Sequence, residues 1–326
     1  MNYASFCDTL TASLLSRLDS GTSVRMQQIQ KNNGICLDAL CFFRDCTRCS
    51  PLVYLDPLYD EYLSGGSLDE ICSEILRGLR KEPPFTDEFL ERMQDIDSVK
   101  DLISFRLISR KDNKTLLSDV PWVPFLDLAM VFYLYLGSTA STHTTALIHT
   151  EQMTLWHLST ESLYCLAVKN TPRLFPASIY RLEDLLAGEL ISTVSSDPGA
   201  FPGAHPLSGP IASDLLPDSS PALYVLTNSA GIHGAACLAY RDIIKNFADQ
   251  AGMDLIILPS SIHEVLLIPD TRSCRYEDIR DMIKKVNSED VPPEDRLSDE
   301  LYLYDRSSCR LMIWNSDVTP DTPEPV

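Results

Sequence analysis

The stretch DLIILPSSIHEVLLIP (residues 254–269) joins two apolar runs through a short polar turn. Each run is long enough for a buried strand, and the Pro-Ser-Ser sequence between them is typical of a turn. Helical patterns precede the stretch at 234–252 and follow it at about 276–287. Adjacent strands with a short connection, placed between helices, indicate an α+β fold in which mixed sheets are flanked by helices.

Signals of the same kind occur near the start of the chain. The Asn-Asn-Gly sequence at 32–34 predicts a hairpin between strands at about 24–29 and 35–43. Ser67 and Glu70 form a capping box, and apolar residues recur after it at helical spacing. We therefore expect a hairpin followed by a helix that begins near residue 67.

Three longer predictions concern the rest of the chain. The run FLDLAMVFYLYL (125–136) predicts one long buried strand. TESLYCLAVKN (160–170) predicts a helix ended by Asn170 and Pro172, because proline disrupts a helix interior. GAACLAYRDIIKNFADQAG (234–252) predicts a single helix.

Residues 193–221 are rich in proline, glycine and serine and predict a linker or long loop. They separate an N-terminal α+β lobe (1–192) from a C-terminal α+β lobe (222–315), and the tail (316–326) is expected to be disordered. Both lobes have the order strand, helix, strand, strand, helix. An internal duplication into two similar lobes is one interpretation of that order.

The charge balance excludes several classes of protein. A net charge of -19 and a pI near 4.6 argue against a nucleic-acid binder, which needs a basic face. The longest apolar run is too short to span a bilayer, and the first residues lack the features of a signal peptide. We expect an acidic cytoplasmic protein that contacts neither nucleic acid nor membrane, with its ten cysteines reduced.

Four of those cysteines lie close together in GICLDALCFFRDCTRCS (34–50): Cys36, Cys41, Cys46 and Cys49. A four-thiolate zinc site normally pairs two CxxC-type knuckles, and only one is present here. Cys36 and Cys41 are five residues apart, which places them on opposite faces of a strand. The pattern favours incidental or structural thiols, and a metal or redox role remains the alternative.

His263 and Glu264 resemble the start of the HExxH zinc motif, but the fourth residue after His263 is Leu267. In a strand, Ser261 and His263 face one side and Glu264 the other, so His263 and Glu264 cannot share a metal. No G-x-S-x-G elbow presents a nucleophilic serine. We expect a turn that leads these two ionisable residues into the start of the second strand, and no bound cofactor.

Several blocks together resemble one known family. The blocks are SPLVYLDPLYDEYLSGGSLDEICSEIL (50–76), VPFLDLAMVFYLYL (123–136), LYCLAVKNTPRLFP (163–176), LYVLTN (223–228) and GAACLAYRDIIKNFADQAGMDLIILPSSIHEVLLIPD (234–270). In this order they are similar to the family catalogued as domain of unknown function 5688, over about residues 22–305. The resemblance implies a bacterial cytoplasmic protein with one architecture. It carries over no activity, cofactor or catalytic residue.

One constellation of polar residues would be brought together if the two lobes stack. Asp127, inside an apolar run, and His263 with Glu264 occupy equivalent places in the two halves, and Asn228 ends a neighbouring strand. A buried acid must be paired or lie at a cleft. The absence of a complete catalytic motif favours a protein- or peptide-interaction or regulatory module. The alternative is a hydrolase or small-molecule-binding enzyme with an inter-lobe site near His263 and Glu264.

Overall fold

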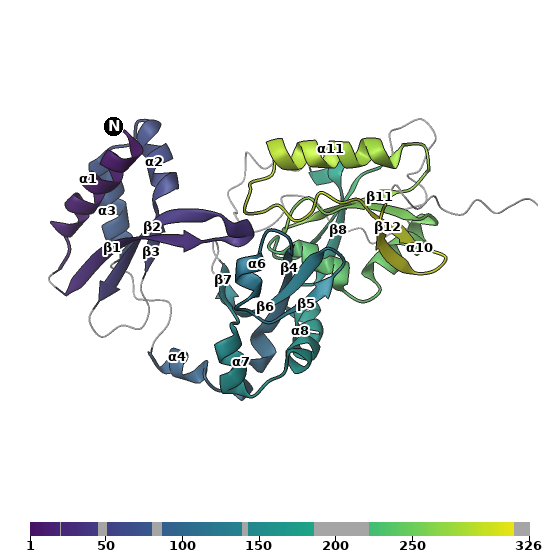
Figure 1. The fold of residues 1–326 in the computed structure, drawn as a ribbon, viewed down its shortest axis with the longest axis horizontal. Helices are drawn as coiled ribbons and strands as arrows, with labels where there is room; N and C mark the ends of the chain where they lie inside the picture. The colour runs from purple at the N-terminus through teal and green to yellow at the C-terminus, as the bar shows by residue number, and fades with distance from the viewer. Residues whose placement is uncertain (20, 45–50, 80–86, 139–142, 186–221, 316–326) are drawn as a thin grey trace, which may run out of the picture. The chain divides into compact units, whose positions relative to one another are not determined.

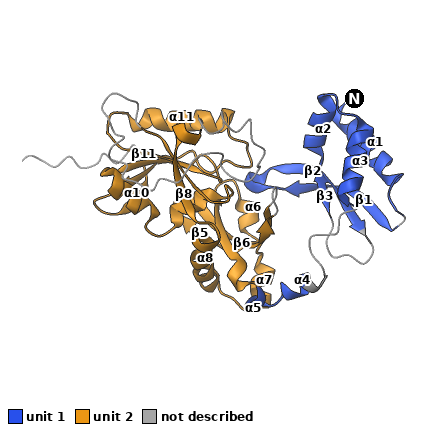
Figure 2. Cartoon of the chain, turned by 180° about the vertical axis from the view of Figure 1, so that it is seen from behind, with its two compact units in different colours: residues 1–98 blue, residues 99–326 orange. Residues whose placement is uncertain are grey.

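The computed structural model describes residues 1–19, 21–44, 51–79, 87–138, 143–185 and 222–315 (Figure 1). The chain divides into two compact units, residues 1–98 and 99–326 (Figure 2). The linker expected at 193–221 falls within the sequence of the second unit, and it lies outside the described residues, as does the tail 316–326.

The first unit packs helices against one face of a small antiparallel sheet. Its strands, in sheet order, are β1 (Thr22–Gln30), β2 (Cys36–Arg44) and β3 (Leu52–Tyr54). Its helices are α1 (Tyr3–Leu15), α2 (Leu55–Leu63), α3 (Leu68–Leu79) and α4 (Asp87–Arg92), with α5 (Ile96–Val99) at the boundary between the units. Phe6, Leu40 and Ile71 lie in its core, so α1, β2 and α3 share one apolar interior.

The hairpin and the capped helix of this unit are confirmed. β1 and β2 pair antiparallel around a short 3-10 turn, η1 (Asn32–Gly34), in which Asn33 has a φ of 58°. Asparagine tolerates this left-handed conformation better than most residues, which explains the signal in the sequence. At α3 the Ser67 backbone N–H donates to a carboxylate oxygen of Glu70 at 3.3 Å, one of the two bonds of a capping box.

The second unit contains two antiparallel sheets. In the first, β6 (Leu128–Ser138) pairs with β4 (Ile103–Ser109), β5 (Trp122–Phe125) and β7 (His143–Leu147). The second has the order β13 (Arg310–Ile313), β12 (Tyr302–Asp305), β10 (Leu255–Leu258), β11 (Val265–Pro269), β9 (Tyr224–Asn228) and β8 (Ala177–Arg181). The α+β class is confirmed, although the described strand pairs are antiparallel rather than mixed.

Helices cover both faces of the six-stranded sheet. The helices of this unit, with two 3-10 segments, are η2 (Lys100–Leu102), α6 (Lys114–Leu117), α7 (Thr150–Trp156), α8 (Thr160–Leu174), η4 (Gly234–Ala239), α10 (Ile243–Ala251) and α11 (Tyr276–Glu289). Ile283 of α11 packs in a cluster with Ile256 on one face. On the other face, the ring of Phe247 in α10 meets that of Tyr224 in β9 edge-on, with centroids 5.0 Å apart. No helix in the described part of the chain is both long and apolar enough to cross a membrane.

Two element predictions in this unit are wrong in instructive ways. The run 125–136 is a hairpin rather than one strand, because the chain reverses at Leu126 and Asp127 between β5 and β6. The helix predicted at 234–252 is interrupted after η4, where Asp242 has a φ of 63° that an α-helix does not contain.

Two predicted boundaries also differ from the structure. Helix α8 continues through Pro172 to Leu174 rather than ending at Asn170. Asn170 instead turns inward, and its side-chain amide donates to the carbonyl oxygens of Lys100 and Ile103. Strand β11 begins at Val265, so His263 and Glu264 lie in the turn before it and not in the strand.

Candidate functional site

Asp127 lies at the tip of the hairpin between β5 and β6. The residue before it, Leu126, has a φ of 54°, a left-handed conformation that is unfavourable for leucine. This turn directs the Asp127 carboxylate to Ser298, whose hydroxyl donates to it at 2.7 Å, and to the hydroxyl of Tyr302. Burial and the nearby Asp127 charge raise the pKa of Tyr302, so its hydroxyl stays protonated and donates. Asp127 therefore ties the four-stranded sheet to the six-stranded sheet.

A cavity of about 630 Å³ opens beside Asp127. It lies between the segment after β4 and the segment before β12. Its lining residues are Arg110, Lys111, Lys114, Leu117, Ser118, Trp122, Asp127, Ser298, Asp299 and Glu300. This size lies within the range of pockets that hold small molecules or the side chains of a peptide.

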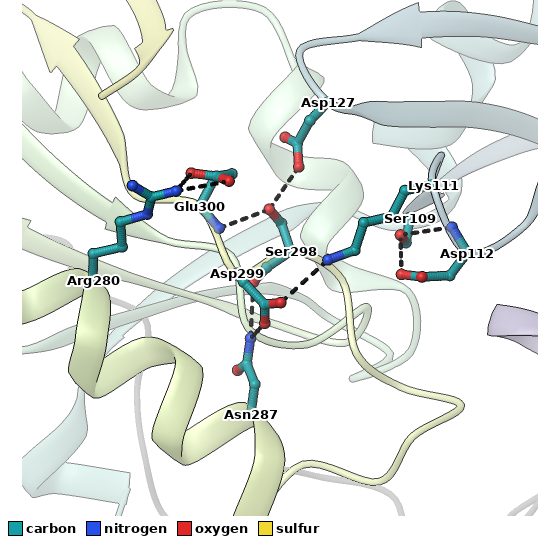
Figure 3. A network of polar contacts seen from close by, with 9 residues as sticks. All are labelled: Ser109, Lys111, Asp112, Asp127, Arg280, Asn287, Ser298, Asp299 and Glu300. Atoms are coloured by element: carbon teal, nitrogen blue, oxygen red, sulfur yellow. Dashed lines mark hydrogen bonds and ion pairs between the residues drawn. The ribbon is translucent and has the colours of Figure 1, made fainter. Parts of the chain in front are cut away.

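The acidic groups of the lining are all engaged by donors (Figure 3). Asp299 accepts hydrogen bonds from Lys111 at 3.2 Å and from the side chain of Asn287 at 2.9 Å. Burial acts to raise the pKa of Asp299, but these two bonds hold it below its usual value. Glu300 forms an ion pair with Arg280 at 3.0 Å. Each carboxylate around the cavity thus has a partner supplied by the fold.

The basic groups of the same lining are only partly engaged. Lys111 is paired with Asp299. Arg110 and Lys114 are exposed, and neither has a hydrogen bond or ion pair within the described ranges. Trp122 and Leu117 add a partly buried apolar wall. Two cations thus lack an ionic partner among the described residues, against one carboxylate, Asp127, whose partners are neutral hydroxyls. The charge that remains at this cavity is therefore positive, although the chain as a whole carries -19.

His263 lies in a second polar cluster of the same unit. Its Nδ1 accepts the backbone N–H of His233 at 3.3 Å, and its Nε2 lies 3.3 Å from a carboxylate oxygen of Asp295. Because Nδ1 accepts, the proton of the neutral ring is on Nε2, where it can donate to Asp295. The His263 ring stacks on that of His233 with centroids 5.8 Å apart.

Glu264 and Asn228 complete the group of residues singled out by the sequence. Burial raises the pKa of Glu264, and the neighbouring His263 acts in the opposite direction. Asn228 is buried and closes a turn, since its amide donates to the carbonyl of Ile232 at 2.7 Å and its oxygen accepts the N–H of Ala230 at 3.0 Å. Both polar ends of Asn228 are thus used by the backbone.

One segment connects the two clusters. Ser298 bonds Asp127, and Asp295, three residues earlier, pairs with His263. Backbone hydrogen bonds hold this segment against the turn before β11, including one from Leu297 to Ser260 at 3.0 Å. The cavity lining contains Asp127 but not His263 or the residues beside it.

Several residues at these sites had no signal in the sequence. Ser298, Asp299 and Lys111 lie in segments without a motif, and only the folded chain brings them to Asp127. Arg106 did offer a signal, because it is the single charge within the apolar strand LISFRLIS at 102–109. A charge at such a position requires a partner.

The cysteines predicted as a weak metal site are only partly described. Cys36 is exposed and Cys41 is buried, both on β2, and Cys46 and Cys49 lie outside the described residues. No group of three or more histidine, cysteine, aspartate or glutamate side chains placed to hold a metal occurs in the described part of the chain.

Comparison with known proteins gives one match. A family model described as Family of unknown function (DUF5688) matches residues 3–306. No curated protein and no solved structure matches the chain. The match covers both compact units and supplies no activity.

Proposed function

The chain belongs to the DUF5688 family of unknown function, and we propose that it is a non-catalytic binding module that holds a short acidic segment of another protein in the cavity beside Asp127. One observation carries this proposal: the three carboxylates of the lining are paired, whereas Arg110 and Lys114 are not paired with any described residue. The ligand that complements this lining is an anion.

The charge of the whole chain makes this local excess informative. At physiological salt, exposed charges interact over only about 8 Å, so a carboxylate at the cavity responds mainly to the nearest groups. Those groups include Arg110 and Lys114, at either end of a five-residue segment. The acidic surface outside the cavity repels an acidic segment. Binding of such a segment is therefore restricted to the cavity.

The apolar part of the lining supports a peptide rather than a free inorganic anion. Trp122 and Leu117 offer a surface that an ion does not use. In a peptide, the carboxylate of a glutamate or aspartate would contact Arg110 and Lys114. An apolar residue next to it in the peptide would pack against the indole of Trp122. Tryptophan and arginine, the residue types of Trp122 and Arg110, are enriched at the energetic centres of protein interfaces.

A catalytic role is less well supported by the same geometry. The Asp127 carboxylate already accepts two hydroxyl hydrogen bonds. The hydrolase or small-molecule-binding enzyme near His263 and Glu264 is the second candidate, and the observation that favours it is the pairing of His263 with Asp295. In that pair, however, the Nδ1 lone pair that would act as a base accepts the His233 N–H.

Fluorescence anisotropy with two matched peptides tests the binding proposal. The first peptide alternates glutamate with phenylalanine and leucine, and the second replaces each glutamate with glutamine. We expect binding of the acidic peptide only, with affinity that falls as salt is added. The double variant Arg110→Gln/Lys114→Gln should weaken it about tenfold or more, a loss of at least about 1.4 kcal/mol.

The control variant is Arg241→Gln/Lys285→Gln, which removes two exposed cations away from the cavity. Equal binding of both peptides, or an equal loss in the control variant, would contradict the proposal. Complete competition by acetate at the affinity of the peptide would show that the cavity takes a small anion instead.

A further inference from the structure

We propose that Arg106 and His233 form a second, internal site that binds a small oxyanion, the phosphate or carboxylate group of a ligand. Arg106 lies in the middle of β4, where the other six residues are buried. The residue as a whole is partly exposed, whereas the Nε of its guanidinium is buried. This site is separate from the cavity lining and stands independently of the proposed peptide binding.

The guanidinium of Arg106 lacks a counter-ion among the described residues. Within the described ranges, Nη1 donates to Nε2 of His233 at 3.4 Å, and the buried Nε has no partner. Burial lowers the pKa of Arg106, and the neighbouring Tyr133 acts in the opposite direction. A buried cation without an anion is strongly unfavourable, because water no longer solvates it and no charge replaces the water.

The hydrogen-bond pattern fixes the protonation of His233. An arginine side chain can only donate, so Nε2 of His233 must accept and the ring proton is on Nδ1. Burial, together with the positive charge of Arg106 and the nearby His263 and His143, lowers the pKa of His233 well below its usual value. The ring is therefore neutral, and its Nδ1–H is a buried donor with no acceptor in the described part of the chain.

The uncompensated positive charge of Arg106 and its buried Nε donor identify the missing group. Water could accept this N–H group but would leave the charge, and a metal cation would be repelled by Arg106. A phosphate or carboxylate group supplies both the acceptor atoms and the negative charge, and arginine is the side chain best suited to bind such groups.

The local backbone holds His233 in place for such a role. His233 has a φ of 52°, and the next residue, Gly234, packs so closely that an added Cβ would lie 2.2 Å from the Thr227 hydroxyl oxygen and 2.3 Å from the carbonyl oxygen of His263. The His233 ring also meets the ring of Tyr133 edge-on and stacks on that of His263. Little rearrangement is then needed when the anion binds.

Titration of the full chain with inorganic phosphate and, separately, with acetate tests the proposal in a buffer free of other oxyanions. Isothermal calorimetry should detect one site, and the ring nitrogen signals of His233 should shift in an NMR spectrum at saturation. Tighter binding of phosphate would identify a phosphate-bearing ligand, and tighter binding of acetate a carboxylate-bearing one. Binding that leaves the His233 signals unchanged would overturn the proposal, as would the absence of binding by either anion.

Two variants locate the site. Arg106→Gln keeps hydrogen-bond donors but removes the charge, and it should weaken binding of the anion about tenfold or more. Arg110→Gln removes a cation from the separate cavity and should leave this binding unchanged. An equal loss in both variants would show that the anion binds at the cavity and not at Arg106. If Arg106→Gln does not fold, the His233 signals of the unmodified protein decide the question alone.

Discussion

Asp127 and Arg106 are charged residues within the same compact unit, and the chain surrounds them differently. The difference lies in the partners that the fold supplies to each charge. Asp127 receives two hydroxyl hydrogen bonds, from Ser298 and Tyr302. Among the residues that the structure describes, Arg106 has one long contact, to a neutral histidine, and its buried Nε has no partner. The fold supplies hydrogen-bond donors to the first charge, whereas the described residues supply no anion to the second.

The difference shows how a structural charge can be separated from a ligand-binding one. A charge whose partners all come from the chain contributes to stability and leaves little for a ligand to bind. A charge that the chain leaves without a partner costs stability until a ligand supplies one. Removing the Asp127 side chain should therefore lower the free energy of unfolding, and removing the Arg106 side chain should raise it. A variant at Gly234, which is tightly packed beside this site, should give the largest loss of the series.

The largest loss of stability is expected for Gly234→Ala. The added methyl group would overlap the backbone carbonyl of His263 and the Thr227 side chain, so the two turns beside Arg106 must separate. We expect a loss of about 3 kcal/mol in the free energy of unfolding, measured by denaturant titration. Gly78→Ala is the control, because nothing lies within 4 Å of its added Cβ and it is in helix α3, where alanine is favoured. Similar losses in the two variants would show that the close contact is not the cause.

Asp127→Ala should be the next most damaging change. It leaves the hydroxyl of the fully buried Tyr302 without its charged acceptor and also releases Ser298. We expect a loss of about 2–3 kcal/mol by the same measurement. Asp101→Ala, at an exposed carboxylate, should change stability by less than about 0.5 kcal/mol. If Asp127→Ala lowers the free energy of unfolding no more than Asp101→Ala does, the partners of Asp127 do not stabilise the fold, and the comparison with Arg106 fails.

Arg106→Met should have the opposite sign in a buffer without oxyanions. It replaces a buried, uncompensated cation with an apolar side chain of similar length, and we expect a gain of about 1 kcal/mol. Added phosphate should then stabilise the unmodified protein and not the variant. Arg77→Met, at an exposed position in helix α3, should be close to neutral. A clear loss of stability in Arg106→Met would mean that the chain already compensates Arg106.

The smallest effect concerns the pH dependence of Glu264. Because burial raises the pKa of Glu264 in the folded state, folding favours its protonated form. Its unfavourable contribution is absent at low pH and grows as the pH rises through the folded-state pKa. The free energy of unfolding of Glu264→Gln should thus increase relative to the unmodified protein between about pH 4 and 7. Glu289→Gln, at an exposed carboxylate, should show no such trend.

Local sequence signals predicted the elements that depend on local chemistry. The hairpin at Asn33 and the helix after Ser67 were predictable, since each rests on the conformational preference or hydrogen bonding of nearby residues. The resemblance to the family was confirmed over 3–306. The reversal at Leu126 was not predictable, because leucine at a positive φ opposes local preference and only contacts with distant residues compensate for it.

The candidate sites were predictable only one residue at a time. The isolated charges Asp127 and Arg106 stand out in apolar runs, but their partners do not. Ser298 lies far from Asp127 along the chain, in a segment without periodicity. His233 lies in a turn that contacts the turn containing His263, and this contact depends on the pairing of β9 with β11. Only the tertiary structure shows that Asp127 has hydrogen-bond donors around it and that Arg106 lacks an anionic partner among the described residues.

The bonds from Ser298 and Tyr302 to Asp127 also constrain the order in which the chain can fold. They join residues 171 and 175 positions apart, so the hairpin of β5 and β6 can form early, but its strained tip is secured only when residues near 300 have been synthesised. Contacts of such high sequence separation slow folding. During translation the tip of the hairpin cannot make these two bonds until the segment before β12 and β12 itself have been synthesised. Incompletely folded chains are prone to aggregate, and the two hydrogen bonds of the Asp127 carboxylate help to complete the fold.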